Sequence, residues 1–186
     1  MPVADWWRAL WPDPGAVVTA VGIAPGMDII DLCSGDAWFT LPIAKTARSV
    51  TAIDIDEAML EAARDRLAGA GVTNCRLMRG DAYGVARLAP HPADFVLMAN
   101  AFHGVPDKPR FASAVRDALK PAGRFAIVNW HRKPREETVV LGEARGPATE
   151  LRMAPQETIA AAEAGGLRFA KLIELPPYHY GVVFER

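Results

Sequence analysis

The chain has 186 residues, a formal net charge of −1 and 51% hydrophobic residues, a composition typical of one compact domain with its own core. Its near neutrality argues against nucleic acid and against an acidic membrane as the main partner, because such binders carry clustered basic residues. The 4 histidines and 2 cysteines lack the spacing of metal ligands, so no metal site is expected, and Cys33 and Cys75 are expected to be free thiols.

The N-terminal segment, residues 1–22, is rich in tryptophan. Asp5–Leu10 and Gly15–Val21 are predicted helices, separated by the break at Pro12-Asp13-Pro14. The first residues lack the basic and apolar regions of a signal peptide, and no run of the sequence reaches the roughly 20 apolar residues that cross a bilayer. We therefore expect a cytoplasmic protein.

From Met27 onward, short apolar runs rich in β-branched residues alternate with amphipathic stretches. This alternation predicts an α/β fold, a parallel sheet with helices on both faces. The predicted strands are Met27–Leu32, Ser49–Asp54, Cys75–Arg79, Ala93–Ala99 and Arg124–Trp130. The predicted helices are Trp38–Thr46, Glu57–Ala68, Lys108–Leu119 and Gln156–Ala164.

The last two apolar runs, Arg168–Leu175 and Tyr178–Phe184, flank Pro176-Pro177. They leave no room for a crossover helix, so they are predicted to pair antiparallel at one edge of the sheet. Residues 131–155, which carry mixed charges, glycines and prolines, are predicted to form a mobile excursion above the carboxyl ends of the strands.

Acidic residues lie at successive predicted strand ends, where open α/β sheets bind ligands. The first strand ends at Asp31 and runs into Cys33-Ser34-Gly35, where glycine allows a sharp turn and a ligand close to the backbone. The second ends at Asp54, where a carboxylate can accept both hydroxyls of a ribose. The third runs into Asp81, which can accept from the exocyclic amine of adenine. This series of acids indicates a nucleoside.

These acids, the run Ala93–His103 and the run Leu119–Phe125 together resemble the class I S-adenosylmethionine-dependent methyltransferases, particularly small enzymes similar to ubiquinone- and menaquinone-biosynthesis methyltransferases. The resemblance extends from about Met27 to Trp130. It implies a Rossmann-like, doubly wound, mostly parallel seven-stranded sheet in the order 3-2-1-4-5-7-6 with an antiparallel C-terminal edge hairpin. The N-terminal helical segment, a cofactor-binding core at 27–131 and a final part at 132–186 would then form one domain.

The resemblance also implies the cofactor, S-adenosylmethionine, and its product, S-adenosylhomocysteine. Family members hold the methionine part at the first turn and the fourth strand end, the ribose at the second strand end and adenine at the third. The positions of this chain that match are Asp31, Cys33, Ser34, Gly35, Asp54, Ile55, Asp81, Ala82 and Asn100.

The chain departs from the family pattern at small residues. Cys33 and Ala37 stand where the family usually has glycine, and Ala122 replaces the first glycine of the usual Lys-Pro-Gly-Gly turn. Residues of this size are still expected to fit. The same departures argue against a nicotinamide-dependent dehydrogenase, whose phosphate-binding turn requires three spaced glycines.

Methyl transfer from a sulfonium is an in-line displacement that positioning alone can promote, so a general base is optional. If the acceptor must lose a proton, the candidates are His103, our candidate catalytic residue, and His131. The alternatives are that His103 packs over the cofactor and that His131 is a solvated loop residue.

Two further segments allow more than one interpretation. Trp6, Trp7 and Trp11 either form a lid over cofactor and substrate or attach their helix to the domain. The charged run 132–137 is most simply a solvated loop, and the sequence does not indicate that it holds an anionic substrate.

The sequence therefore predicts a methyltransferase acting at oxygen, nitrogen or carbon of an unidentified small molecule. One alternative is a non-catalytic protein that binds S-adenosylmethionine or S-adenosylhomocysteine. Another is an aminopropyl transferase, which the position of Asp94 inside a predicted strand disfavours. A metabolite is favoured over a macromolecular acceptor because little chain remains beyond the core, and the sequence leaves a homodimer open.

Overall fold

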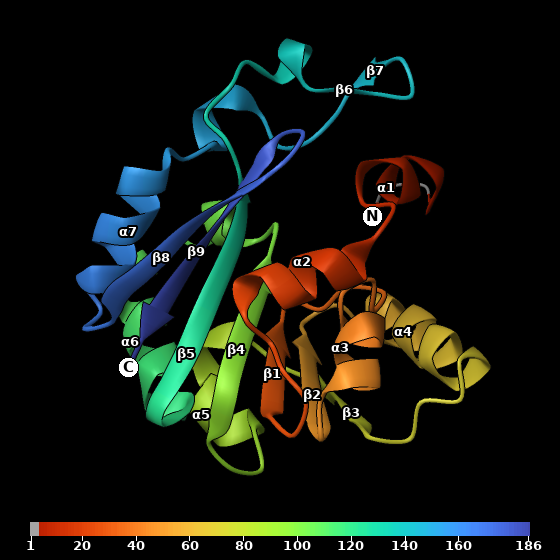
Figure 1. The fold of residues 1–186 in the computed structure, drawn as a ribbon, viewed down its shortest axis with the longest axis vertical. Helices are drawn as coiled ribbons and strands as arrows, with labels where there is room; N and C mark the ends of the chain where they lie inside the picture. The colour runs from red at the N-terminus through yellow and green to blue at the C-terminus, as the bar shows by residue number, and fades with distance from the viewer. Residues whose placement is uncertain (1–3) are drawn as a thin grey trace.

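A seven-stranded sheet runs through the molecule in the order β3-β2-β1-β4-β5-β9-β8 (Figure 1). The structure is a computed structural model that describes residues 4–186. The strands are β1 (Asp28–Leu32), β2 (Ser49–Asp54), β3 (Cys75–Arg79), β4 (Ala93–Ala99), β5 (Leu119–Trp130), β8 (Arg168–Leu175) and β9 (His179–Glu185). Strands β1 to β5 are parallel, whereas β9 pairs antiparallel with both β5 and β8.

The predicted strand order 3-2-1-4-5-7-6 is confirmed once two short strands are set aside. These are β6 (Val139–Val140) and β7 (Glu143–Ala144), which form a separate hairpin between β5 and β8. In Figure 1 this hairpin lies beyond the carboxyl end of β5, on the same side of the molecule as the N-terminal helix α1 (Ala4–Leu10). Helix α1 and strand β6 are in contact, so the N-terminal helix meets the segment that follows β5.

Helices cover both faces of the sheet. Besides α1 they are α2 (Pro14–Val21), α3 (Thr40–Thr46), α4 (Glu57–Gly69), α5 (Val85–Leu88), α6 (Lys108–Ala118) and α7 (Pro155–Glu163). None of the helices in the described part of the chain is long and apolar enough to span a bilayer.

The strands divide the core into two layers because successive side chains point to opposite faces. In β4, Phe95 and Leu97 pack with α1, α2 and α3, whereas Val96 and Met98 pack with α5, α6 and α7. All residues of β1 are buried, as is typical of a parallel strand covered on both faces. The near-continuous apolar runs of the sequence follow from this double burial.

Two predicted boundaries are wrong by two residues or more. The helix expected from Trp38 begins at Thr40, because Pro42 has no N–H to donate to the Trp38 carbonyl, and the unbroken run of helical bonds starts with that from the N–H of Ile43 to the Phe39 carbonyl. The strand expected from Arg124 begins at Leu119, because Leu119 already pairs with Ala93 before a shift in register.

A charged cluster joins the amino ends of β1 and β4. The ammonium of Lys120 lies 2.9 Å from Asp28 and 2.8 Å from Asp94. Arg48 and Lys120 hold the pKa of the Asp28 carboxyl well below its usual range against the opposing effect of burial. Asp94 is therefore paired with Lys120 at the end of the sheet opposite the carboxyl ends of the strands.

Candidate functional site

The turn after β1 has a backbone that suits glycine at several positions. Cys33, Gly35 and Ala37 all have left-handed φ values, of 56°, 55° and 67°. A residue with a Cβ costs roughly 1–2 kcal/mol in this conformation, and glycine does not. Cysteine and alanine therefore keep the sharp turn at some cost in stability.

Asp54 attaches this turn to the end of β2. One of its carboxylate oxygens accepts from the backbone N–H of Gly35 at 2.8 Å, and the other accepts from the backbone N–H of Asp56 at 3.0 Å. A carboxylate can accept about four hydrogen bonds. Asp54 therefore positions the turn and retains lone pairs for a ligand.

Asp31 is a buried acid at the end of β1, with 2% of its surface exposed. Burial raises the pKa of its carboxyl to about 7, and the nearby charge of Asp54 adds to this, whereas a 2.6 Å hydrogen bond from the Thr40 hydroxyl opposes it. Among residues 4–186, no cationic side chain forms an ion pair with Asp31. A cationic group of a ligand would stabilise the ionised form.

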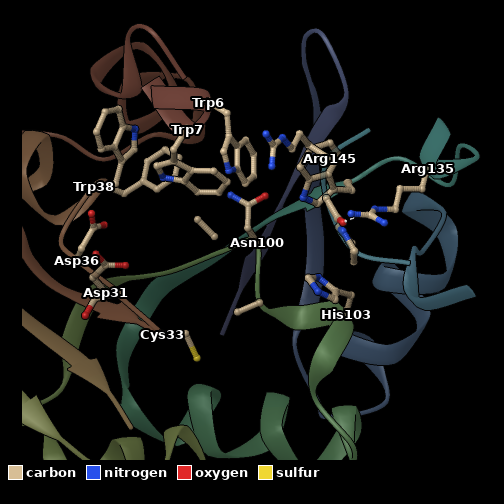
Figure 2. A pocket seen from close by; sticks show the side chains of 18 residues that line it. Trp6, Trp7, Asp31, Cys33, Asp36, Trp38, Asn100, His103, Arg135 and Arg145 are labelled. Atoms are coloured by element: carbon tan, nitrogen blue, oxygen red, sulfur yellow. Dashed lines mark hydrogen bonds between the residues drawn. The ribbon is translucent and has the colours of Figure 1, made fainter. Parts of the chain in front are cut away.

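Two cavities open at the carboxyl ends of the strands and share Cys33 and Ala101 in their walls. The smaller has a volume of about 330 Å³, and residues from the ends of β2 and β3 line it, including Asp54, Ile55, Asp81, Ala82 and Tyr83. The larger has a volume of about 540 Å³, and Asp31, Ser34, Gly35, Asn100 and His103 are among its lining residues (Figure 2). All nine predicted cofactor residues thus line one or both cavities.

Cys33 lies where the two cavities meet. Burial raises the pKa of its thiol to about 12, and the charges of Asp54, Asp31 and Asp81 all contribute. Asp31 lines the larger cavity and Asp54 and Asp81 line the smaller, so the acids of three strand ends lie in the two cavities that share Cys33. The thiol stays protonated near neutral pH, so it is not a nucleophile.

The smaller cavity combines apolar and acidic surfaces. Ile55 exposes 67% of its surface at the cavity wall, although it is a large apolar residue. Asp81 accepts from the backbone N–H of Tyr83 at 2.9 Å and begins a short turn of helix. An exposed apolar side chain beside a carboxylate suits a flat ring that carries an amino group.

Asn100 projects into the centre of the larger cavity, between Trp7 and His103 (Figure 2). Its backbone is left-handed, with φ 60°. Within the part of the chain that the structure describes, neither its amide nitrogen nor its amide oxygen has a hydrogen-bond partner, although both are buried. Buried amides normally have partners, so this one is suited to a polar ligand.

His103 lies at the wall of the larger cavity, and its Nδ1 is 3.4 Å from the Asn129 side-chain oxygen. Burial lowers the pKa of the imidazole, and the charges of Lys108 and Arg152 lower it further. If Nδ1 carries the proton and donates it to Asn129, then Nε2 is a free acceptor. The ring is then neutral near pH 7.

The remaining aromatic and histidine candidates divide between the cavity and the core. Trp6 and Trp7 line the larger cavity. Trp11 instead packs against Phe39 and His179, with ring centroids 5.4 and 4.4 Å away, so it attaches α1 to the core. His131 is not among the lining residues in the described chain, and its Nε2 lies 2.9 Å from Glu174.

Several residues that line the larger cavity are not among the site residues predicted from the sequence. Trp38, Phe39 and Trp130 add aromatic surface, while Arg135 and Arg145 add positive charge. The tryptophan at 38 follows the glycine turn directly, which is a signal that could have been used. Nothing in the sequence pattern indicates that the two arginines reach the cavity, because they belong to the irregular residues 131–155.

The part of the chain that contains the ends of β1 to β4 is similar in sequence to known proteins. Residues 29–123 match the family model of the methyltransferase domain. Demethylmenaquinone methyltransferase of Staphylococcus aureus is 30% identical over 110 residues, which are 58% of this chain and 44% of that protein. The 2-phytyl-1,4-naphtoquinone methyltransferase of Synechococcus elongatus is 35% identical over 117 residues, 58% of this chain and 48% of that protein. The matches thus span less than half the length of these curated relatives.

Solved structures share the fold over nearly the whole chain. A methyltransferase dependent on S-adenosylmethionine from Aquifex aeolicus has a TM-score of 0.81 at 24% identity, covering 96% of this chain and 92% of that chain. A second, from Mesorhizobium loti, has a TM-score of 0.70 at 21% identity, covering 96% and 98%. At these identities the likeness concerns the fold alone.

Proposed function

Because the chain belongs to the methyltransferase-domain family, whose class I members use S-adenosylmethionine, we propose that it transfers a methyl group from this cofactor to a small molecule in the larger cavity. The observation that carries the proposal is the convergence of Asp31, Asp54 and Asp81 on Cys33, where the two cavities meet. An elongated ligand with a nucleoside at one end would use both cavities and all three acids.

The smaller cavity is the proposed nucleoside site. The carboxylate of Asp54 would accept the ribose hydroxyls while it continues to hold the backbone of Gly35. Asp81 and the backbone of Ala82 would bind the polar edge of adenine, and the exposed side chain of Ile55 would cover a face of the ring.

The part of the larger cavity beside the first turn is the proposed methionine site. The buried carboxyl of Asp31 would bind the ammonium group, which supplies the cation that the carboxyl lacks. The unpartnered amide of Asn100 would bind the polar end of the amino acid. Cys33, Ser34 and Gly35 form the adjacent wall. These unsatisfied groups support the fit of the cofactor.

When bound, S-adenosylmethionine supplies a methyl group on a sulfonium centre, whose leaving group needs no protonation. The chain contributes positioning, because side chains from α1, the first turn and β5 enclose the remaining space and exclude water. Nε2 of His103 would accept a proton from an acceptor that must lose one. A His103→Gln variant that keeps the wild-type rate would exclude this proton-transfer role.

The proposed function is tested by calorimetric titration with S-adenosylmethionine and S-adenosylhomocysteine, followed by turnover assays with metabolite mixtures. We expect both ligands to bind with micromolar affinity and methylated product to accumulate. Failure of both to bind would refute the proposal. Binding without turnover of any mixture would instead favour a non-catalytic binding protein.

A further inference from the structure

We propose that the methyl acceptor is an aromatic compound with an anionic substituent such as a carboxylate, and that Arg145 and Arg135 bind this substituent. The proposal rests on the proposed function, since it names the class of molecule that the larger cavity receives. It follows from the charge, the unpartnered groups and the aromatic surface on one side of that cavity.

Charges in the larger cavity are separated by sign. Asp31 and Asp36 lie on one side in Figure 2, and Arg145 and Arg135 lie on the other. Asp36 is neutralised by Arg66, whose Nη2 is 2.5 Å away. The acidic side suits the cationic end of the proposed cofactor. The charged side chains that line the opposite side are both arginines.

Arg145 pairs with one exposed carboxylate, and Arg135 pairs with none in the described residues. Arg145 pairs with Glu143, which is 68% exposed, and its guanidinium lies 5.4 Å from the centre of the Trp6 ring. Its Nε is buried without a hydrogen-bond partner in the described residues. Arg135 lies at the rim of the cavity, where its Nε donates to the Gly146 carbonyl at 3.1 Å. No carboxylate among residues 4–186 forms an ion pair with Arg135.

A third arginine behind the wall strengthens the positive charge. Arg152 is 1% exposed and is held by the hydroxyl of Thr138 and the carbonyls of Pro147 and Arg145. Its Nη1 is buried without a partner in the described chain, and no carboxylate there pairs with it. Burial lowers the pKa of this guanidinium, and the charge of Arg135 lowers it further, whereas the charge of Glu136 opposes both. An anion at the wall would relieve this repulsion.

The same side of the cavity is aromatic. Trp6 and Trp7 form one wall, with ring planes 87° apart, and Trp130 forms another. Arg152 lies 5.1 Å from the centre of the Trp130 ring, and Tyr178 stacks on the same ring. Flat apolar walls next to guanidinium groups match a ring that carries a carboxylate.

The test uses two probes of the same shape and different charge, 1-hydroxy-2-naphthoate and 1-hydroxy-2-naphthamide. Each is titrated into the protein by calorimetry, with saturating S-adenosylhomocysteine and without it. We expect the naphthoate to bind at least about tenfold more tightly than the amide, and more weakly as salt is raised. Arg145→Gln should reduce the ratio of the two affinities about tenfold, and Arg135→Gln, at the exposed rim, should reduce it about threefold.

Arg132→Gln is the matched control, because Arg132 belongs to the same loop but pairs with Glu157 outside the cavity. This variant should leave the affinity for both probes unchanged. Equal affinities for the two probes, or no binding of either, would overturn the proposal. An Arg145→Gln variant that loses affinity for S-adenosylhomocysteine would assign the arginine to the cofactor instead, which also overturns it. Titration without the cofactor measures the preference for the anion even if the proposed function fails.

Discussion

The backbone N–H of Gly35 donates a 2.8 Å hydrogen bond to the carboxylate of Asp54. This bond joins the turn after β1 to the end of β2, so one side chain supports both the proposed ribose site and the adjacent turn. A substitution of Asp54 therefore acts on binding and on stability together, and a control must separate the two effects.

Asp54→Ala should weaken binding of S-adenosylmethionine and S-adenosylhomocysteine by at least about tenfold, because hydrogen bonds from both ribose hydroxyls are lost. It should also destabilise the fold by about 1–3 kcal/mol, because the N–H of Gly35 loses its acceptor. Calorimetric titration and urea unfolding measure the two effects. Asp56→Ala is the control: its side chain accepts from the N–H of Ala58 at the start of α4, so it should cost about 1 kcal/mol of stability without weakening binding. Equal loss of affinity in both variants would contradict the ribose role.

Binding of S-adenosylmethionine should depend on pH through Asp31. Its pKa is raised to about 7 in the free protein, and pairing with an ammonium group requires the ionised form. Affinity should therefore fall about tenfold between roughly pH 7 and 5.5, and binding should release protons in that range. Titrations in buffers of different ionisation enthalpy measure both quantities. Asp31→Asn should bind more weakly at pH 7 with little pH dependence, and a variant that keeps the full dependence would exclude Asp31 as its source.

The stability of the free protein should depend on pH through His179. This residue is buried between Trp11 and Trp130, and burial, with the charges of His131 and Arg152, holds its pKa well below the ordinary value. Below about pH 6.5 the unfolded chain takes up a proton that the folded chain does not, so His179 favours folding above this pH and the contribution is lost as the pH falls.

His179→Phe should accordingly reduce the acid-side loss of stability by up to about 1.4 kcal/mol per pH unit relative to wild type. Urea unfolding between pH 7.5 and 5.5 measures this difference. The comparison with wild type cancels the opposite contribution of Asp31, whose raised pKa makes stability fall as the pH rises from about 4 to 7. His91→Gln, a change at an exposed histidine, should leave the profile unchanged. Parallel profiles for His179→Phe and wild type would contradict the prediction.

Ala122→Gly should stabilise the protein by about 0.5–1 kcal/mol. Ala122 is exposed and has a left-handed backbone with φ 64°, so glycine relieves strain without removing a buried contact. Ala62→Gly, at an exposed position in the interior of α4, should instead destabilise by about 0.5–1 kcal/mol. Thermal unfolding of the two variants should show shifts of opposite sign. Shifts of the same sign would mean that the left-handed alanine carries little strain.

The fold and the acidic part of the site could be predicted because both follow from local pattern. The strands are apolar runs buried on both faces, and Asp31, Asp54 and Asp81 lie at or just after their carboxyl ends, which a parallel sheet brings to one edge. The turn before α3 could be predicted only in part. The left-handed conformation of Ala37 is rare for alanine and leaves no trace in the hydrophobic pattern.

The cationic wall could not be predicted in the same way. Arg145 and Arg152 belong to residues whose path is determined by long-range packing on Trp130, Trp6 and Thr138. No periodicity describes such a path, and charged residues in an irregular segment are ordinarily solvated. The interpretation of residues 132–137 as a simple solvated loop therefore has to be revised for Arg135, which lines the cavity.

The contact between α1 and β6 has a consequence for how such an enzyme diversifies. The proposed cofactor half is built from strand ends, whereas much of the acceptor wall comes from two segments outside the sheet. We expect that exchanging residues 4–11 and 131–155 together with those of a relative, and not singly, would change which acceptor is bound and leave the proposed cofactor half intact. The contact couples these segments physically, so a change such as Trp6→Leu would also remove the ring beside the guanidinium of Arg145.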